Sequence, residues 1–254
     1  FAPFILPKPP SHNRLTRGQF RPTLIVTMGG IDDYRSQIVQ IGQRLQENGF
    51  IAGTDGNISV RLNPDRILIT PAGKAKGRLN PEQLVVVTLD GARVEGTEAP
   101  TSEMAMHLEV YRARPDINAC VHSHPPYATA FAVAGTPVPD DVLPEVVVFV
   151  GAIPICEYAP PGTDAVPKSL TPYVASHNAF LLRNHGLLTI GQSLEQASNR
   201  HETVEHYARI LWLAKQLGDP NWNRIPREDF MRLERIRNQV EKSLGPTERE
   251  AAGK

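Results

Sequence analysis

The chain has 254 residues, of which 41% are hydrophobic and 21% charged, and its formal net charge is +0. This length suits one large globular domain with a sizeable core. The balanced charge supplies no basic field, and no apolar run approaches the roughly 20 residues of a membrane span, so we expect neither nucleic acid nor a membrane as partner. The two cysteines form no CxxC motif and are too few for a disulfide framework, which fits a reducing cytoplasm.

The first half of the chain predicts an arm, a helix and a group of strands. Residues 1–30 are rich in proline and basic residues and lack the order of a signal peptide, so they predict an extended arm. Apolar residues recur every three or four positions from Ile31 to Phe50, which predicts a helix. Residues 57–62 alternate between polar and apolar, which predicts a half-buried strand, and the turn at 63–65 leads into a second strand at 66–70. A further strand is expected at 84–89.

The second half predicts alternating short helices and strands. The segment from Pro100 has the residues of a helix start, with the hydroxyls of Thr101 and Ser102 before Glu103 in the first turn. Strands are expected at 118–124, 145–149, 153–156, 179–182 and 187–190, and helices at 127–134, within 164–176, and at 193–218. The pattern indicates one α/β domain over residues 31–218, with a hairpin-rich sheet, followed by a charged and partly helical tail at 219–254.

Two histidines two residues apart end the strand at 118–124. Successive side chains of a strand point to opposite faces, so His122 and His124 share one face, and Pro125 ends the strand. Two imidazoles on a stiff support suit one divalent metal. His185 follows another buried strand and Glu103 begins a helix, so both are candidates for the same edge of the sheet. Cys120 on the same strand face and His107 one helical turn after Glu103 are competing candidates.

Three imidazoles and one carboxylate suit Zn²⁺, although Co²⁺, Mn²⁺ or Fe²⁺ would also accept this set. Small residues and hydroxyls near Glu103 add a candidate anion site. Backbone N–H groups and hydroxyls in turns and at helix starts bind phosphate without net positive charge. The candidates lie in two loops and at the helix start: Thr54, Gly56, Asn57, Gly73, Thr101 and Ser102.

Five linked motifs over residues 31–218, namely GNISVRL, ILITPAGK, PTSEMAMH, INACVHSHPP and LLRNHGLLTIG, resemble the class II aldolase/adducin family in their order and spacing. Within that family, the chain looks like a member near the L-fuculose-phosphate aldolases. It implies a three-layer α/β/α domain with a central, largely antiparallel sheet, in a homotetramer with active sites at subunit boundaries. It also implies Zn²⁺ bound by Glu103, His122, His124 and His185, and a phosphate pocket formed by the anion-site candidates together with Ala72.

This chain departs from the aldolase pattern at two positions. The aldolases commonly have threonine at the position of Ala72, so one phosphate hydroxyl is missing here. Their catalytic tyrosine would align near Leu143, where this chain has none. Glu145 is a nearby candidate for a polar contact with the aldehyde oxygen.

The expected reaction is reversible cleavage of a ketose or deoxyketose 1-phosphate to dihydroxyacetone phosphate and an aldehyde. A metal would act as a Lewis acid, and Glu103 would leave it as substrate arrives and carry the proton at the enediolate carbon. The same site is also compatible with a sugar-phosphate epimerase, dehydratase or decarboxylase. A non-enzymatic interaction domain of the adducin kind is the remaining alternative, which the filled ligand positions disfavour.

Overall fold

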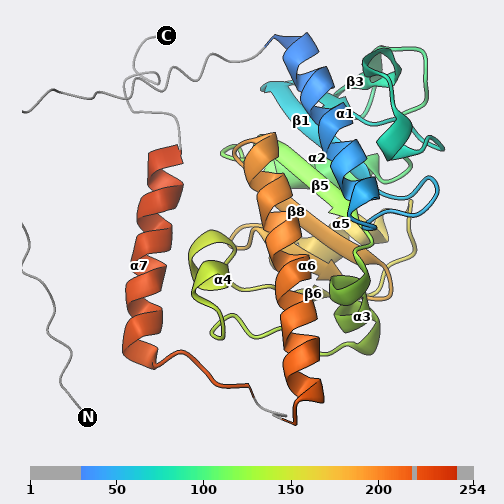
Figure 1. Ribbon diagram of the computed structural model, residues 1–254. Coiled ribbons are helices and arrows are strands. Elements are labelled where there is room, and N and C mark those ends of the chain that lie inside the picture. Colours follow the sequence, from blue (N-terminus) through green and yellow to red (C-terminus); the bar gives the residue numbers. More distant parts are fainter. Residues whose placement is uncertain (1–29, 219–221, 245–254) are drawn as a thin grey trace, which may run out of the picture.

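The computed structural model describes residues 30–218 and 222–244, so the arm predicted at residues 1–30 lies outside the described residues except for Gly30. A sheet in the order β4-β3-β2-β1-β5-β8-β7-β6 forms its centre (Figure 1). All neighbouring strands are antiparallel except β6 and β7. The strands are β1 (Asn57–Asn63), β2 (Arg66–Ile69), β3 (Val85–Thr88), β4 (Arg93–Glu95), β5 (Ala119–Ser123), β6 (Ile155–Cys156), β7 (Ala179–Leu182) and β8 (Gly186–Gly191).

Helices cover both faces of this sheet, which confirms the expected three-layer α/β/α architecture. One face carries α1 (Ile31–Glu47) and α6 (Leu194–Gln216), and the other carries α2 (Met104–Ala113) and α5 (Ala165–Leu170) (Figure 1). The remaining helices are α3 (Pro126–Ala134), α4 (Pro144–Phe149), α7 (Arg227–Leu244) and two short 3₁₀ turns, Lys76–Arg78 and Pro81–Gln83. Among the residues described, no helix combines the length and apolar character that a membrane span requires.

The period of two in the strands divides the apolar side chains between the two layers of helices. In β2, Ile67 and Ile69 pack with α2 and α5, whereas Leu68 points to α1 on the opposite face. Strand β1 is buried on both faces over Asn57–Val60, so the half-buried strand predicted from its alternation is wrong at this end. Its polar face is covered by α2, whose side chains hydrogen-bond to it.

The largest difference from the predicted elements lies at residues 145–149, where the structure has helix α4 instead of a strand. Pro144 occupies the first helical turn, where its missing N–H leaves no bond unmade, and Gly151 ends the segment with φ +85°. The β-branched run Val146–Val148 is buried in this helix. Burial of these valines therefore outweighs their preference for strands.

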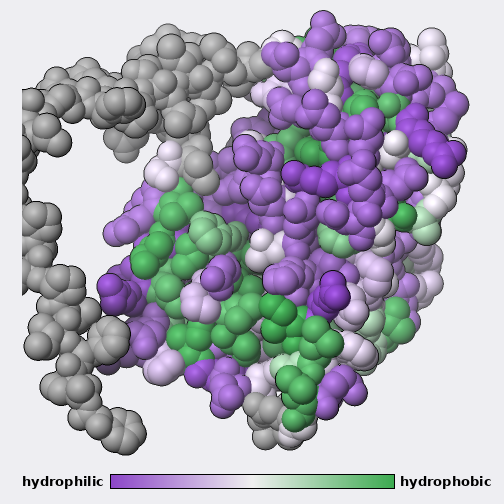
Figure 2. Space-filling model, in the orientation of Figure 1, coloured by the Kyte–Doolittle hydropathy of each residue, from purple (hydrophilic) through white to green (hydrophobic). Residues whose placement is uncertain are grey.

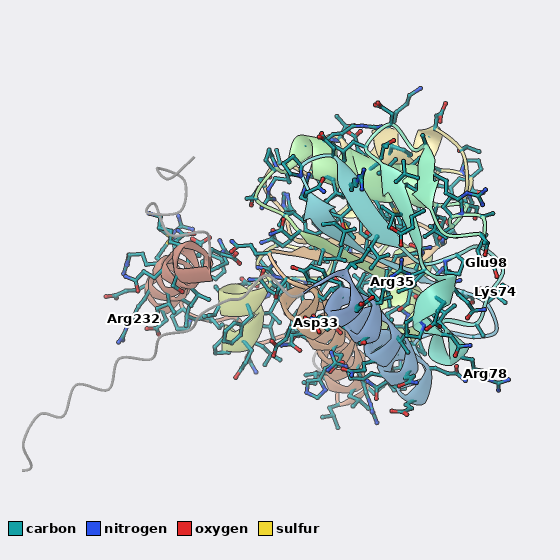
Figure 3. All side chains as sticks on the ribbon, turned by 90° about the horizontal axis from the view of Figure 1, so that it is seen from above. Asp33, Arg35, Lys74, Arg78, Glu98 and Arg232 are labelled. Carbon is teal, nitrogen blue, oxygen red and sulfur yellow. The ribbon has the colours of Figure 1, made fainter. Side chains whose placement is uncertain are left out.

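Helix α6 begins as predicted, because Ser193 accepts a hydrogen bond from the N–H of Gln196 at 3.1 Å. The charged tail contains α7, which stands beside α4 at the edge of the body (Figure 3). Its Glu241 forms an ion pair with Arg200, whose side chain is 2% exposed. Arg237 adds a hydrogen bond to the carbonyl of Val147 at 3.1 Å. The domain boundaries at 30 and 218 stay predictions.

Candidate active site

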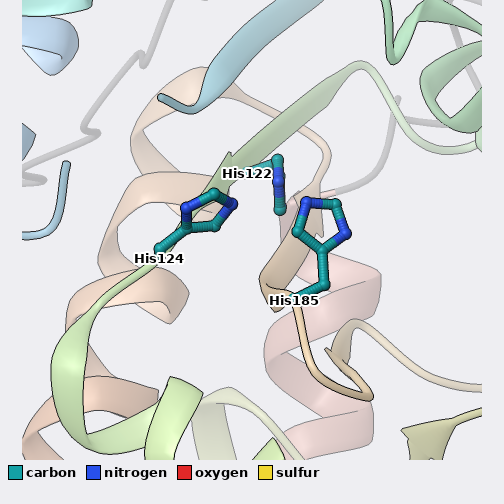
Figure 4. A group of neighbouring side chains, drawn as sticks. All are labelled: His122, His124 and His185. Atoms are coloured by element: carbon teal, nitrogen blue, oxygen red, sulfur yellow. The ribbon is translucent and has the colours of Figure 1, made fainter. Parts of the chain in front are cut away.

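Three imidazoles converge where the neighbouring strands β5, β7 and β8 begin or end, inside the sheet rather than at its edge strands (Figure 4). His122 lies in β5, His124 follows the end of that strand, and His185 lies in the turn between β7 and β8. Their ring centroids are 4.8–5.2 Å apart, and one nitrogen from each ring lies within 4.8 Å of the others. The antiparallel pairing of β5 with β8 and of β8 with β7 brings the three segments together.

Glu103 reaches the same point from the start of α2, so the structure brings all four predicted metal-binding residues together. Its Oε1 lies 3.1 Å from Nε2 of His185, and its Oε2 lies 3.3 Å from Nε2 of His122. Glu103 is the N-cap residue rather than a member of the first turn, because α2 begins at Met104. The hydroxyl of Thr101 accepts a hydrogen bond from the backbone N–H of Glu103 at 3.3 Å, which fixes the approach to the helix.

The free lone pairs at this point fit a divalent cation. Nδ1 of His122 donates to the carbonyl of Leu187 at 2.9 Å, which leaves the lone pair on Nε2. Among the described residues, Nε2 of His122, Nε2 of His124 and Oε1 of Glu103 are buried without a hydrogen-bond partner. Buried polar atoms normally have partners, so a cluster of such atoms aimed at one point has the arrangement that could hold a metal ion.

Burial and neighbouring charges leave the pKa values of both Glu103 and His124 below their usual values. Burial raises the pKa of Glu103, but attraction to the imidazoles of His122 and His185 outweighs it and leaves that pKa well below its usual value. Burial, followed by repulsion from His122 and His185, lowers the pKa of His124 to about 4. The carboxylate and the His124 ring therefore carry the unprotonated forms that bind a cation.

Gly186 is required by the close packing at the site. A Cβ on this residue would lie 2.6 Å from Cδ2 of His124 and 2.6 Å from the carbonyl oxygen of Ser123. The preceding Asn184 has φ +55°, so the turn between β7 and β8 is sharp. These two features together let the ring of His185 lie beside β5.

The segments predicted to bind phosphate lie together next to Glu103. Pro71 pairs with Pro100 in an isolated bridge, which joins the loop of Ala72 and Gly73 to the strand-like approach of Thr101. Thr54 and Ser102 are exposed, and Thr101 is 6% exposed. Gly56 has φ +75°, and a Cβ there would lie 2.9 Å from the carbonyl oxygen of His122, so only glycine fits.

The side chain of Asn57 points to Glu103 rather than into the loop. Its Nδ2 donates to Oε2 of Glu103 at 2.8 Å, and its Oδ1 contacts the ring of His107. Both ends of this amide are therefore used within the protein. His107, the competing ligand candidate, likewise has both ring nitrogens occupied, by Asn57 and Ser59. Cys120 lies in the core, where burial raises the pKa of its thiol to about 12.

Three residues near the site were missed in the sequence. Asp55 lies 3.3 Å from Nδ1 of His124, the place of a carboxylate that orients a metal-binding imidazole. The only sequence feature that pointed to Asp55 is its position between two candidate residues, Thr54 and Gly56. Lys76 is 3% exposed, and its ammonium donates to the carbonyl of Thr54 at 2.7 Å. His201, in α6, is fully buried. No local sequence pattern predicts the burial of Lys76 or of His201.

A hollow of about 610 Å³ opens beside the start of α3. It is lined in part by Tyr127, Glu145 and Arg209, and by Pro126, which follows the histidine segment almost directly. Glu145, the candidate for a polar contact, thus lines open space next to the proposed metal-binding segment.

Comparisons with known proteins agree with this geometry. Residues 36–212 match the family model described as "Class II Aldolase and Adducin N-terminal domain". The 3-oxo-tetronate 4-phosphate decarboxylase of Pectobacterium atrosepticum is 32% identical over 78% of this chain and 91% of its own length. The 5-deoxy-D-ribulose 1-phosphate aldolase of Bacillus thuringiensis serovar kurstaki is 33% identical over 78% and 92%.

Solved structures show the same likeness. YgbL from Klebsiella pneumoniae is 34% identical, with a TM-score of 0.74 over 81% of this chain and 100% of that chain. The family match covers more than half of the chain, and the relatives are matched over most of their length. The resemblance inferred from the five motifs is thereby confirmed, and the chain belongs to the class II aldolase and adducin family.

Proposed function

We propose that this protein is a metal-dependent aldolase that reversibly cleaves a ketose or deoxyketose 1-phosphate to dihydroxyacetone phosphate and an aldehyde. The observation that carries the proposal is the convergence of Glu103 with the imidazoles of His122, His124 and His185. Nε2 of His122, Nε2 of His124 and Oε1 of Glu103 are buried there without a hydrogen-bond partner. Relatives with aldolase activity at 33% identity support the reaction class. Zn²⁺, or Co²⁺, Mn²⁺ or Fe²⁺, held by Glu103, His122, His124 and His185 would supply Lewis-acid stabilisation of the oxygens that gain charge.

The residues of the chain account for the movement of one proton. When the C3–C4 bond breaks, its electron pair stays on C3 and the C4 hydroxyl passes its proton to solvent as the aldehyde forms. Glu103 takes up one proton from solvent in the same cycle, so the number of protons is unchanged. Glu103 lies beside the imidazole cluster and gives a proton to C3, which completes dihydroxyacetone phosphate. In the synthetic direction, the Glu103 carboxylate removes that proton. Glu145 is our candidate for the group that contacts the aldehyde oxygen, because it lines the same hollow as Pro126, which is two residues after His124.

The phosphate is held, in this proposal, by the loops that meet beside Glu103. Their members are Thr54, Gly56, Asn57, Ala72, Gly73, Thr101 and Ser102, with Asn57 contributing through its backbone because its amide is engaged elsewhere. Binding of the phosphate holds the reacting carbons of the substrate next to Glu103. The binding energy is thereby used to orient the substrate for reaction.

A decarboxylase is the second candidate, because a relative with that activity is 32% identical over 203 residues. A 3-oxo acid phosphate that loses CO₂ leaves its electron pair on the same kind of carbon, next to a carbonyl. Protonation of that carbon by Glu103 would then give the same three-carbon phosphate. The two reactions therefore share the site and differ in the fragment that leaves.

Product analysis tests the proposal. The metal-loaded protein is incubated with a panel of ketose and deoxyketose 1-phosphates and with a 3-oxo-tetronate 4-phosphate. Dihydroxyacetone phosphate is followed by a coupled reductase, and the aldehyde and CO₂ are measured separately. An aldehyde released together with dihydroxyacetone phosphate is the expected result. Release of CO₂ with dihydroxyacetone phosphate but without an aldehyde would replace the aldolase by the decarboxylase, and no product from any compound would overturn both.

We also propose a homotetramer with active sites at subunit boundaries, in the cytoplasm. Apolar side chains gather on the surface over α4, α6 and α7 (Figure 2), among them Phe149, Leu213 and Met231, which supports an interface there. The buried free thiols of Cys120 and Cys156 support a reducing compartment. Light scattering coupled to gel filtration should give a mass of four chains, and a monomer at assay concentration would contradict the assembly.

A further inference from the structure

A chain of buried hydrogen bonds runs from the core to Glu103. Helix α2 presents Tyr111, His107 and Glu103 at intervals of four residues, which places them on one face. Strand β1 presents Ser59 and Asn57, two residues apart, on the face that α2 covers. Side chains of the two rows alternate along one series of hydrogen bonds.

Each step of this chain is within hydrogen-bond distance. The hydroxyls of Tyr111 and Ser59 are 2.7 Å apart, and Oγ of Ser59 is 2.6 Å from Nδ1 of His107. Nε2 of His107 is 2.5 Å from Oδ1 of Asn57, and Nδ2 of Asn57 is 2.8 Å from Oε2 of Glu103. Tyr111, Ser59, His107 and Asn57 are each at most 2% exposed, so water does not compete for these bonds.

The direction of every bond follows from the carboxylate at its end. An ionised Glu103 only accepts, so the amide of Asn57 turns its NH₂ to Glu103 and its oxygen to His107. Nε2 of His107 must then donate, and burial, which lowers the pKa of His107 to about 3, keeps the ring neutral. Nδ1 therefore accepts from Ser59, whose only hydroxyl proton is then used. Tyr111 accordingly donates to Ser59.

We propose that Tyr111, Ser59, His107 and Asn57 form a one-way chain of donors that locks the amide of Asn57 with its NH₂ toward Glu103 and so positions that carboxylate for proton transfer. His107 is a positioning residue, because it acts through Asn57 and touches neither the substrate nor the imidazole cluster. The inference rests on the proposed role of Glu103 as the group that carries the proton.

The chain also assigns different tasks to the two carboxylate oxygens. Oε2 receives the N–H of Asn57, whereas Oε1 lies on the side of His185 and has no such donor. The N–H of Asn57 thus fixes the carboxylate through Oε2, and Oε1 stays turned toward the imidazole cluster. Without the lock, the Asn57 amide can turn over and present its oxygen to Glu103, which would repel the carboxylate.

Three variants of the full-length protein test the lock. His107→Gln keeps an N–H near the position of Nε2, so it should hold the amide and keep kcat within about threefold of wild type. His107→Leu removes the donor, so kcat should fall by about 10–100-fold with KM little changed. Ser59→Ala deletes the hydrogen bond that fixes the tautomer of His107. Its kcat should lie between those of the two His107 variants, and it replaces His107→Leu if that variant does not fold.

His201→Leu is the matched control. His201 is also fully buried and also lies between two hydroxyls, those of Ser123 at 2.7 Å and Thr189 at 3.1 Å, but it makes no hydrogen bond to Asn57 or Glu103. Its loss should lower the melting temperature without lowering kcat of the folded protein. An equal loss of kcat in His107→Leu and His201→Leu would overturn the lock in favour of a general structural role.

A second readout does not depend on turnover. Crystal structures of the metal-free variants should show the Asn57 amide turned over, or Glu103 displaced, in His107→Leu but not in His107→Gln. An unchanged contact between Asn57 and Glu103 in His107→Leu would refute the inference even if the wild-type protein is inactive. If the contact changes but the wild-type protein cleaves no substrate, the lock stands and the proposed function fails.

Discussion

Oε1 of Glu103 lies 3.1 Å from Nε2 of His185, although one residue begins helix α2 and the other lies in the turn between β7 and β8. A carboxylate oxygen and an imidazole nitrogen at this distance attract one another through a proton or a cation that lies between them. The contact is therefore consistent with a cation that Glu103 and His185 would bind together with His122 and His124.

The first prediction concerns Glu103→Gln. The amide keeps one oxygen for the cation but can neither accept nor give the proton at the reacting carbon. Zinc content should stay close to that of the wild-type protein, while kcat falls by about 10²–10⁴-fold. Metal analysis and steady-state kinetics on the same preparation check both parts. Full turnover in this variant would remove Glu103 from the reaction.

The second prediction concerns His185→Ala, which deletes one imidazole of the three. Added Zn²⁺ should raise the melting temperature of the wild-type protein, because a ligand that binds only the folded state stabilises it. This increase should be largely lost in His185→Ala. His177→Ala is the control, since His177 hydrogen-bonds to Tyr173 and lies outside the imidazole cluster. Equal increases in both variants would argue against a shared metal.

The third prediction concerns Lys76. Its ammonium uses two donors on the carbonyls of Thr54 and Lys74, which leaves a third donor and a positive charge beside the proposed phosphate loops. Lys76→Met should raise KM for a phosphorylated substrate by about 10-fold or more, as expected for a lost charge-assisted bond, with a smaller effect on kcat.

Lys74→Met is the control for this measurement. Lys74 pairs with Glu98 at 3.1 Å on the outside of the same loop (Figure 3), and both side chains are about a third exposed or more. Its removal should leave KM unchanged, because exposed ion pairs contribute little. If both variants raise KM equally, Lys76 has no special role in binding the anion.

Much of the fold could be predicted from the sequence, because the strands and the long helices have clear periods. The pair His122 and His124 was readable because a strand repeats every two residues. Placing His185 and Glu103 beside them needed the linked family motifs, since pairing between distant strands leaves no local signal. Helix α4 was mistaken for a strand because the valine run alone favours one, and its burial decides otherwise.

Other features of the site were beyond the sequence. The bonds of His107 to Ser59 and Asn57 depend on how α2 lies across β1, which neither segment encodes alone. Lys76 is buried only because its backbone packs against α1, where a Cβ on Gly42 would lie 2.3 Å from its carbonyl oxygen. Such contacts are tertiary, and the residues involved look like ordinary surface residues in the sequence.

The fourth prediction concerns the attachment of α7. Glu241→Ala leaves the buried guanidinium of Arg200 without its carboxylate, although bonds to the carbonyls of Phe149 and Ile190 remain. The free energy of unfolding should fall by about 1–3 kcal/mol, the cost of a buried donor left unsatisfied. Proteolysis of α7 should accelerate. Lys242→Ala, an exposed neighbour, should change neither quantity.

The fifth prediction concerns the thiols. Burial raises the pKa of both Cys120 and Cys156 to about 12, so their reactive thiolate forms are scarce at pH 8. A disulfide reagent should label neither thiol in the folded protein and both in denaturant. Because a raised pKa favours the neutral thiol, labelling of the folded state should stay slow until strongly alkaline pH. Fast labelling at pH 8 would mean that this core opens readily.

The most direct test of the central claim is anomalous diffraction at the zinc edge from crystals grown with Zn²⁺. We predict one strong peak about 2.0–2.2 Å from a nitrogen of each of His122, His124 and His185, with a Glu103 oxygen completing the set. The absence of any peak between these side chains in zinc-saturated crystals would contradict the account.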